Sequence, residues 1–155
     1  MNAVDLLKKD HQLVKQMLMK LAATTERGTK TRMDLLNKLH TELSIHTELE
    51  ERIFYPAYVQ AGGKEEEKMF YEAKEEHRTV ESLVLPDLLN TPADSAPFAG
   101  RAKVLKELLE HHIKEEEEEM FPKAEKLLGK KRLEELGQQM ESHKLKMKQS
   151  MGHAA

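Results

Sequence analysis

The strongest constraint on the fold of this chain is an internal repeat, in which two halves of the sequence match at one offset of 66 residues, the difference between positions 77 and 11. Apolar positions follow the same offset, as Leu39 and Leu105 show. A duplication of this kind predicts two similar helical hairpins packed face to face. The repeated polar and special residues are His11 and His77, His46 and His112, Glu50 and Glu116, Glu51 and Glu117, Pro56 and Pro122, with Asp10 matched by Glu76.

Apolar residues recur at alternating steps of three and four in four long segments, which is the spacing of one face of a helix. The segments cover roughly residues 3–24, 31–59, 65–90 and 98–127, and the breaks between them contain glycine or proline. We therefore predict an all-α fold, an antiparallel up-down-up-down four-helix bundle with a pseudo-twofold repeat. Pro56 and Pro122 are expected to kink or stop their helices locally, because proline lacks the amide donor.

The last part of the chain predicts an extra C-terminal helix, roughly residues 131–150, which we expect to pack on the outside of the bundle or to fray. A chain of 155 residues has room for one domain. We expect residues 1–128 to form the bundle and residues 129–155 to form a helix and tail on the same domain. The apolar positions of this helix are Leu133, Leu136, Met140 and Met147.

The composition excludes several classes of function. The chain has no cysteine, so disulfides, thiolate zinc sites and iron–sulfur clusters are excluded, and any metal must be held by nitrogen and oxygen. The net charge of -3, with Lys and Arg interspersed among Glu, argues against a nucleic-acid partner. We expect a cytoplasmic protein with no membrane role, because neither a secretory signal nor a long apolar run is present.

Six ionisable side chains fall on the inward faces of the predicted helices, where an unpartnered carboxylate would cost several kcal/mol. In each His-x-x-x-Glu motif the two side chains are one helical turn apart and can reach one site. Two bridging carboxylates and four terminal imidazoles would give each of two metal ions two nitrogens and two oxygens. The expected metal ligands are His11, His46, Glu50, His77, His112 and Glu116.

The ligand types alone leave iron, manganese and zinc open. Carboxylate-bridged pairs in helix bundles favour iron, so we expect two iron ions, with zinc or manganese as the weaker alternatives. The remaining coordination positions would be filled by water, a bridging oxide, dioxygen or peroxide. Taken singly, each of these histidines could instead be a core residue with a hydrogen bond to a carbonyl, and it is the set of six that favours metal.

Several neighbouring residues have open interpretations. Glu51 and Glu117 either support the ligands or are solvated. Tyr55 and Tyr58 are candidates for a phenolate ligand, or they pack at the bundle end, and ideal helix angles place Tyr58 nearer the ligand face. The nine methionines are interpreted as core fillers. The histidines without a repeat partner are interpreted as surface residues: His40, His111, His143 and His153.

The motifs resemble those of the hemerythrin-like proteins, whose cation-binding domains carry a His-His-Glu motif. Four segments carry the resemblance: residues 6–11, which end at His11, residues 46–56, residues 75–77, which end at His77, and residues 112–122. The resemblance covers about residues 3–127. It implies a non-heme di-iron centre with bridging carboxylates and a bridging oxo or hydroxo group, on His11, His46, Glu50, His77, His112 and Glu116.

Two departures distinguish this chain from the oxygen-carrying hemerythrins that it resembles. The carriers have a further histidine where this chain has Ala73, and their fourth-helix motif is His-x-x-x-x-Asp where this chain has His112-x-x-x-Glu116. These departures remove one nitrogen ligand and argue against reversible oxygen carriage. The resemblance to relatives with a symmetrical ligand set implies a peroxide-decomposing enzyme, with a tyrosine near Tyr55 as a ligand.

Three functional hypotheses follow. The first is a di-iron protein that binds or reacts with dioxygen, peroxide or another small diatomic ligand, with catalase-like activity. The second is a sensor or store of iron, oxygen or nitric oxide without turnover, coupled to a protein partner through the C-terminal helix. The third is a zinc-stabilised bundle without redox chemistry.

Overall fold

The computed structural model describes the backbone of residues 1–154 and the side chains of residues 1–152. Within these residues the chain is entirely helical and has no strand, which confirms the all-α prediction. None of the helices in this range has both the length and the apolar character that crossing a bilayer requires.

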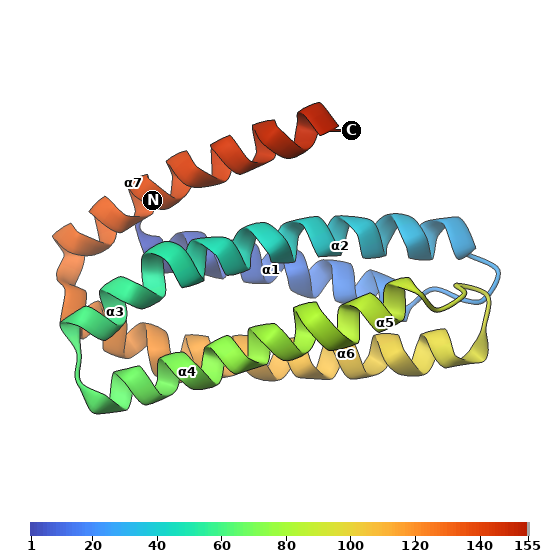
Figure 1. Cartoon of the computed structure of the whole chain (residues 1–155), viewed down its shortest axis with the longest axis horizontal. Helices are drawn as coiled ribbons and strands as arrows, with labels where there is room; N and C mark the ends of the chain where they lie inside the picture. Colours follow the sequence, from blue (N-terminus) through green and yellow to red (C-terminus); the bar gives the residue numbers. More distant parts are fainter. Residues whose placement is uncertain (155) are drawn as a thin grey trace.

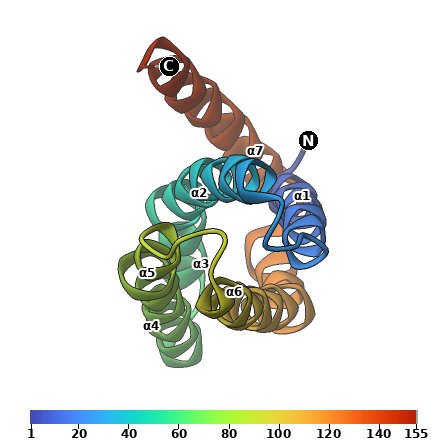
Figure 2. The same cartoon turned by 90° about the vertical axis from the view of Figure 1, so that its right-hand side faces the viewer.

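Four helical rods lie side by side, and each runs opposite to the one before it in the chain (Figure 1). Seen end-on, the rods occupy the four corners of the bundle (Figure 2). The first rod is α1 (Ala3–Ala22); the second is α2 (Thr29–Leu49), η1 (Glu50–Phe54) and α3 (Tyr55–Ala61); the third is α4 (Lys64–Arg78), η2 (Thr79–Val84) and α5 (Leu85–Leu89); the fourth is α6 (Ala96–Glu115), η3 (Glu116–Met120) and the first turns of α7 (Phe121–Ala154).

The rods bury the apolar faces that the sequence predicts. In α1, for example, Val4, Leu7, Val14 and Leu18 are all buried. The buried apolar residues form two clusters, one at each end of the bundle. The predicted ligands lie between the clusters, since the sequence places them between the apolar residues of each rod. A polar layer therefore divides the apolar core across its middle.

Three of the rods contain a π-turn, a single wide turn in which an amide bonds to the carbonyl five residues back. These bonds run from Tyr55 N to Glu50 O, from Leu85 N to Val80 O and from Phe121 N to Glu116 O. A proline follows each turn directly, at positions 56, 86 and 122. Because proline lacks a donor and crowds the carbonyl four residues back, a wider turn accommodates it. The predicted interruptions at positions 56 and 122 are thus π-turns, and the helices continue through them.

The helix α7 is broken at Gly129, whose φ of 76° lies in the left-handed region that glycine tolerates best. We refer to residues 130–154 as the C-terminal helix. It turns back over the ends of α1 and α2 and then leaves the bundle (Figures 1 and 2). Its inner positions Leu133, Leu136 and Met140 are buried in the same apolar cluster as the start of α1, so this part of the helix packs against the bundle.

Candidate metal centre

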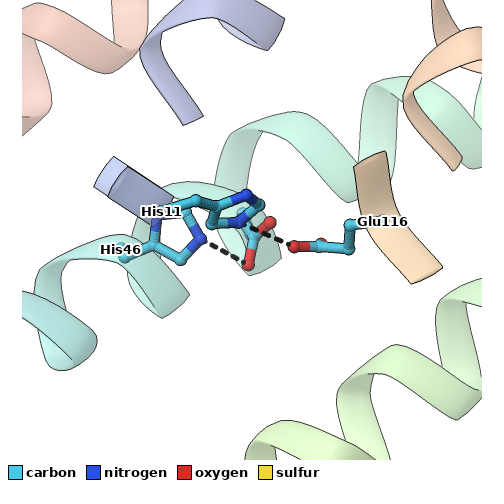
Figure 3. A group of neighbouring side chains, drawn as sticks. His11, His46 and Glu116 are labelled. Atoms are coloured by element: carbon cyan, nitrogen blue, oxygen red, sulfur yellow. Dashed lines mark hydrogen bonds and ion pairs between the residues drawn. The ribbon is translucent and has the colours of Figure 1, made fainter. Parts of the chain in front are cut away.

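The six predicted ligands come from all four rods and meet in the polar layer. His11 lies on α1, His46 on α2, His77 on α4 and His112 on α6, while each glutamate opens a π-turn. All six are buried, and Glu50 has no exposed surface at all. Figure 3 shows His11, His46 and Glu116 pointing toward one another from three different rods. The structure therefore brings the whole predicted set together.

The donor atoms fall into two groups that could each hold a metal ion, and Glu50 belongs to both. The first group is His11, His46, Glu50 and Glu116, and the second is Glu50, His77 and His112. Glu50 Oε1 lies 3.2 Å from His46 Nε2 and 3.1 Å from His77 Nε2. In the same way, Glu116 Oε1 lies 3.1 Å from His11 Nε2 and 3.4 Å from His112 Nε2. Each carboxylate thus spans the two hairpins, as a bridging ligand does.

A carboxylate partner holds the outer nitrogen of every imidazole. The Nδ1–oxygen distances are 2.6 Å for His11 with Glu117, 3.0 Å for His46 with Asp10, 2.8 Å for His77 with Glu51, and 2.7 Å for His112 with Glu76. With Nδ1–H donated outward, Nε2 keeps its lone pair for the interior, the arrangement found in metal-bound histidines. Of the two interpretations of Glu51 and Glu117, the structure favours support of the ligands.

The inner atoms lack the partners that a metal-free polar cluster normally has. His46 Nε2 and both carboxylate oxygens of Glu50 are buried without a hydrogen bond, although Glu50 Oε1 lies 3.2 Å from His46 Nε2. The Nε2 atoms of His77 and His112 face each other at 3.1 Å. Native structures leave few buried polar atoms unsatisfied, and cations accept lone pairs from several such atoms at once. The donor set therefore fits metal ions.

Tyr55, not Tyr58, reaches this cluster. The Tyr55 hydroxyl lies 2.5 Å from Glu116 Oε2 and 3.3 Å from His77 Nε2, whereas the Tyr58 hydroxyl contacts Met69 Sδ. The expectation from ideal helix angles was wrong because the π-turn absorbs one extra residue. An ideal α-helix would place Tyr55 about 140° from Glu50, but with one residue absorbed the separation becomes roughly 40°.

The repeat equivalent of Tyr55 is Phe121, and the two rings have equivalent places. Tyr55 stacks on His77 with ring centroids 5.6 Å apart, and Phe121 stacks on His11 at 5.7 Å. Only the tyrosine carries a hydroxyl, which lies between His77 of the second group and Glu116 of the first. The surroundings of His77 and His11 are therefore chemically unequal despite the duplication.

A cavity of about 20 Å³ adjoins the cluster on the side of the apolar end that includes Leu43 and Leu109. All four histidines line it, together with apolar side chains such as Val14 and Val80. A volume of this size holds about one water-sized molecule. It would admit a diatomic ligand or peroxide and exclude larger organic molecules.

In the metal-free protein the carboxylates hold protons on the imidazoles. Burial alone would lower the pKa of His46, but the neighbouring carboxylates of Glu50, Asp10 and Glu116 together outweigh it and raise this pKa to about 10. Burial likewise opposes protonation of His77, but the adjacent carboxylates of Glu50 and Glu51 raise the pKa to about 9. Burial and the charge of Glu116 raise the pKa of Tyr55 well above its usual value. A cation that binds here must therefore displace protons from the imidazoles.

These shifts predict opposite pH behaviour for the metal-free and metal-loaded protein. A raised imidazole pKa stabilises the fold fully below the unfolded value of 6.5, and this stabilisation is lost as the pH rises toward about 9 for His77 and about 10 for His46. The melting temperature of the metal-free protein is expected to fall across this window. The loaded protein binds neutral imidazole and is expected to lack this loss. If the melting temperatures of the two forms changed with pH in the same way, the assignment of these imidazoles as metal ligands would be contradicted.

The family model described as the hemerythrin HHE cation binding domain matches residues 2–124. This match takes in all four rods and all six clustered residues. The chain belongs to the hemerythrin HHE family. The resemblance expected from the motifs is thereby confirmed.

Relatives and a solved structure agree with this HHE assignment. The chain is 32% identical to the uncharacterized protein Rv2633c of Mycobacterium tuberculosis over 90% of this chain and 83% of that protein. It is 29% identical to an uncharacterized hemerythrin-like protein of Schizosaccharomyces pombe, over 81% of this chain and 60% of that one. The crystal structure of an HHE domain-containing Rv2633c homolog from Mycobacterium kansasii superposes with a TM-score of 0.84 at 30% identity, over 97% of this chain and 89% of that chain.

The other histidines lie outside the cluster of this HHE domain. His40 and His111 are exposed, as expected for surface residues, and His111 lies 2.9 Å from Glu115. His143 is only half exposed, because it lies against Glu48 on α2. The side chain of His153 falls outside the described residues. In the acidic run at 115–119, Glu118 and Glu119 are exposed, whereas Glu116 is buried and Glu117 contacts His11.

Proposed function

We propose that this HHE domain holds two iron ions and decomposes peroxide. The observation that carries the proposal is the pair of donor groups joined by Glu50, with the Tyr55 hydroxyl in contact with Glu116 and His77. The proposed ligands are His11, His46, Glu50, His77, His112 and Glu116.

The donor chemistry supports iron over the alternatives. Two positions that share buried carboxylates and carry only imidazole nitrogens suit a carboxylate-bridged di-iron pair in a helix bundle. Structural zinc sites are usually tetrahedral and closed, and each keeps its own four ligands. Here Glu50 is common to both groups, and a cavity adjoins them.

The side chains around the centre are suited to a small oxygen species. Iron bound there would supply the redox changes that the protein side chains lack. The cavity limits the substrate to about the size of peroxide and keeps it among apolar walls. The Tyr55 hydroxyl donates to Glu116 Oε2, so this pair can hold a proton at the donor cluster, on the side opposite the cavity-lining apolar residues. In the overall reaction two peroxides give two waters and one dioxygen: one peroxide loses two electrons and two protons, and the other gains them as its O–O bond breaks.

The decisive test combines metal analysis with a peroxide assay on the freshly purified protein. We expect two iron ions per chain and oxygen evolution from peroxide. A His46→Ala variant is expected to lose iron and activity, while His40→Ala, a matched change at an exposed position of the same helix, is expected to keep both. Zinc in place of iron, or an iron-loaded protein that evolves no oxygen and shows no spectral change with peroxide, would refute the proposal.

The second candidate is a sensor or store without turnover. It is favoured by the C-terminal helix, which packs on the bundle by one side and diverges from it toward the C-terminus (Figure 1). An iron-loaded protein that changes its spectrum with oxygen, peroxide or nitric oxide but evolves no oxygen would support this function. Partner binding that depends on the iron or its ligand would distinguish a sensor from a store.

A further inference from the structure

Two of the four histidine–carboxylate pairs are equivalent in the repeat but have different surroundings. His46 pairs with Asp10, and His112 pairs with Glu76 at the equivalent position of the second hairpin. In both pairs the carboxylate accepts from the outer nitrogen of an inward-facing imidazole. The difference lies in what contacts the second oxygen of each carboxylate.

Asp10 has a lysine on its second oxygen. Lys144 Nζ lies 2.5 Å from Asp10 Oδ1, while Asp10 Oδ2 lies 3.0 Å from His46 Nδ1. Asp10 is only 6% exposed, so water competes little for either oxygen. Lys144, Asp10 and His46 therefore form one continuous chain of polar contacts from the C-terminal helix to the metal centre.

Glu76 has no such cation. Its second oxygen faces His111 Nε2 at 3.9 Å, and no Lys or Arg nitrogen lies within ion-pair distance of Glu76 among residues 1–152. Glu115 stands next to it, so this side of the bundle is acidic. The C-terminal helix thus supports one half of the duplicated centre and leaves the other half open.

The position of Lys144 depends on close packing of the C-terminal helix. Gly137 lies so near the N-terminus of α1 that a Cβ there would stand 2.2 Å from the Met1 carbonyl oxygen. Leu136 and Met140, on the same helix, are buried. Leu145 is exposed, but Met147 is again partly buried against the same apolar cluster. Lys144 therefore lies between two points, Met140 and Met147, at which this helix packs on the bundle.

We propose that the C-terminal helix controls occupancy of one metal position, with Lys144 as a positioning residue that orients Asp10 and, through it, His46. The inference deepens the proposed metal centre and rests on it. With Lys144 in place, Asp10 has both oxygens paired and one orientation, and the His46 ring is held with Nε2 inward. Without Lys144, one buried oxygen of Asp10 has no partner, and the carboxylate is expected to reorient toward another donor. The His46 imidazole then loses the contact that fixes its orientation.

The expected effect is confined to the first group, which contains His11 and His46. Changing the partner of a ligand histidine typically weakens metal binding about 10- to 100-fold. Lys144→Met is therefore expected to weaken one of two metal-binding steps by that factor and to leave the other unchanged. At a free metal concentration between the parent's dissociation constant for that step and the weakened one, such a variant would hold one ion per chain where the parent holds two.

The experiment is a stepwise titration of metal-free protein with ferrous iron under anaerobic conditions, with bound metal measured at each step. Lys144→Arg keeps a cation and is expected to behave like the parent. Lys146→Met, an exposed neighbour, is the matched control and is expected to change nothing. Gly137→Leu is expected to displace the C-terminal helix from the N-terminus of α1 while leaving Lys144 itself unchanged. It should therefore weaken the same single metal-binding step as Lys144→Met. Circular dichroism establishes that each variant is folded.

The possible outcomes separate the two proposals. If the parent takes up two ions and Lys144→Met also takes up two with unchanged affinities, the positioning role is refuted and the metal centre stands. Equal weakening of both steps would also refute it, because the contact reaches only His46. A parent that binds no ion would overturn both proposals. Weakening of one step in both Lys144→Met and Gly137→Leu would establish the role of the helix.

Discussion

Replacement of Glu50 by alanine is expected to remove both metal ions from the protein at once. Glu50 belongs to both donor groups, so its loss takes one bridging ligand from each position. Loss of any single histidine, in contrast, takes a ligand from one position only. Metal analysis of Glu50→Ala after purification in iron-supplemented medium is expected to find far below one ion per chain.

The same substitution is expected to abolish the stabilisation that metal provides. Saturating metal at a thousandfold excess over the dissociation constant stabilises a fold by about 4 kcal/mol per site. For a chain of this size that corresponds to a melting temperature higher by roughly 8–16 °C. Added iron is expected to raise the melting temperature of the parent by roughly 8–16 °C or more. The melting temperature of Glu50→Ala is expected to change little.

Glu118→Ala is the matched control for this prediction. Glu118 is an exposed glutamate in η3, close to Glu116 in sequence and outside both donor groups. It is expected to keep two ions and the full metal-dependent shift in melting temperature. If Glu50→Ala retained both ions, the shared-carboxylate arrangement would be wrong.

Tyr55→Phe is expected to separate metal binding from peroxide chemistry. The change removes one hydroxyl and makes the surroundings of His77 resemble those of His11, where Phe121 already occupies the equivalent place. Two ions are expected to remain, since all six proposed ligands are intact. Oxygen evolution from peroxide is expected to fall about 100-fold, the size of effect usual for a lost proton donor.

Tyr58→Phe is the control for this second prediction. The Tyr58 hydroxyl contacts Met69 and lies away from the cluster, so the variant is expected to keep full activity. A visible absorption band that disappears in Tyr55→Phe and survives in Tyr58→Phe would identify Tyr55 as an iron ligand. Undiminished activity in Tyr55→Phe would show that its hydroxyl takes no part in the reaction.

The sequence predicts the helices and the polar layer well because both depend on local spacing. The repeat fixes which residues of the two hairpins are equivalent, and the three-and-four spacing fixes which faces turn inward. The bounds of the first three rods and the start of the fourth fall within about two residues of those expected, whereas the C-terminal helix runs on from the expected end at residue 150 to Ala154. The six predicted ligands do lie together, while their role as ligands stays a prediction, as does the division of the chain at residue 128.

The π-turns and the contacts of the C-terminal helix could not be predicted in the same way. Proline at positions 56 and 122 signals a disturbed turn but does not say whether the helix stops, kinks or widens. The side-chain angle of Tyr55 depends on that choice. Lys144 reaches Asp10 only because the chain reverses at Gly129, which is a tertiary contact across 134 positions. Pattern analysis within single helices carries no information about such a contact.

The one-residue excess in η1 and η3 has a consequence for any attempt to copy this centre into an idealised scaffold. Straight α-helical rods could reproduce the four imidazoles and two carboxylates, because these lie before the wide turns or at their first residue. They would swing Tyr55 and Phe121 by about 100° around the rod, away from His77 and His11. A designed copy of this centre must therefore include the extra residue of each π-turn and the proline that follows the turn. Without them, the copy would hold the proposed metal ligands but not the aromatic rings beside them.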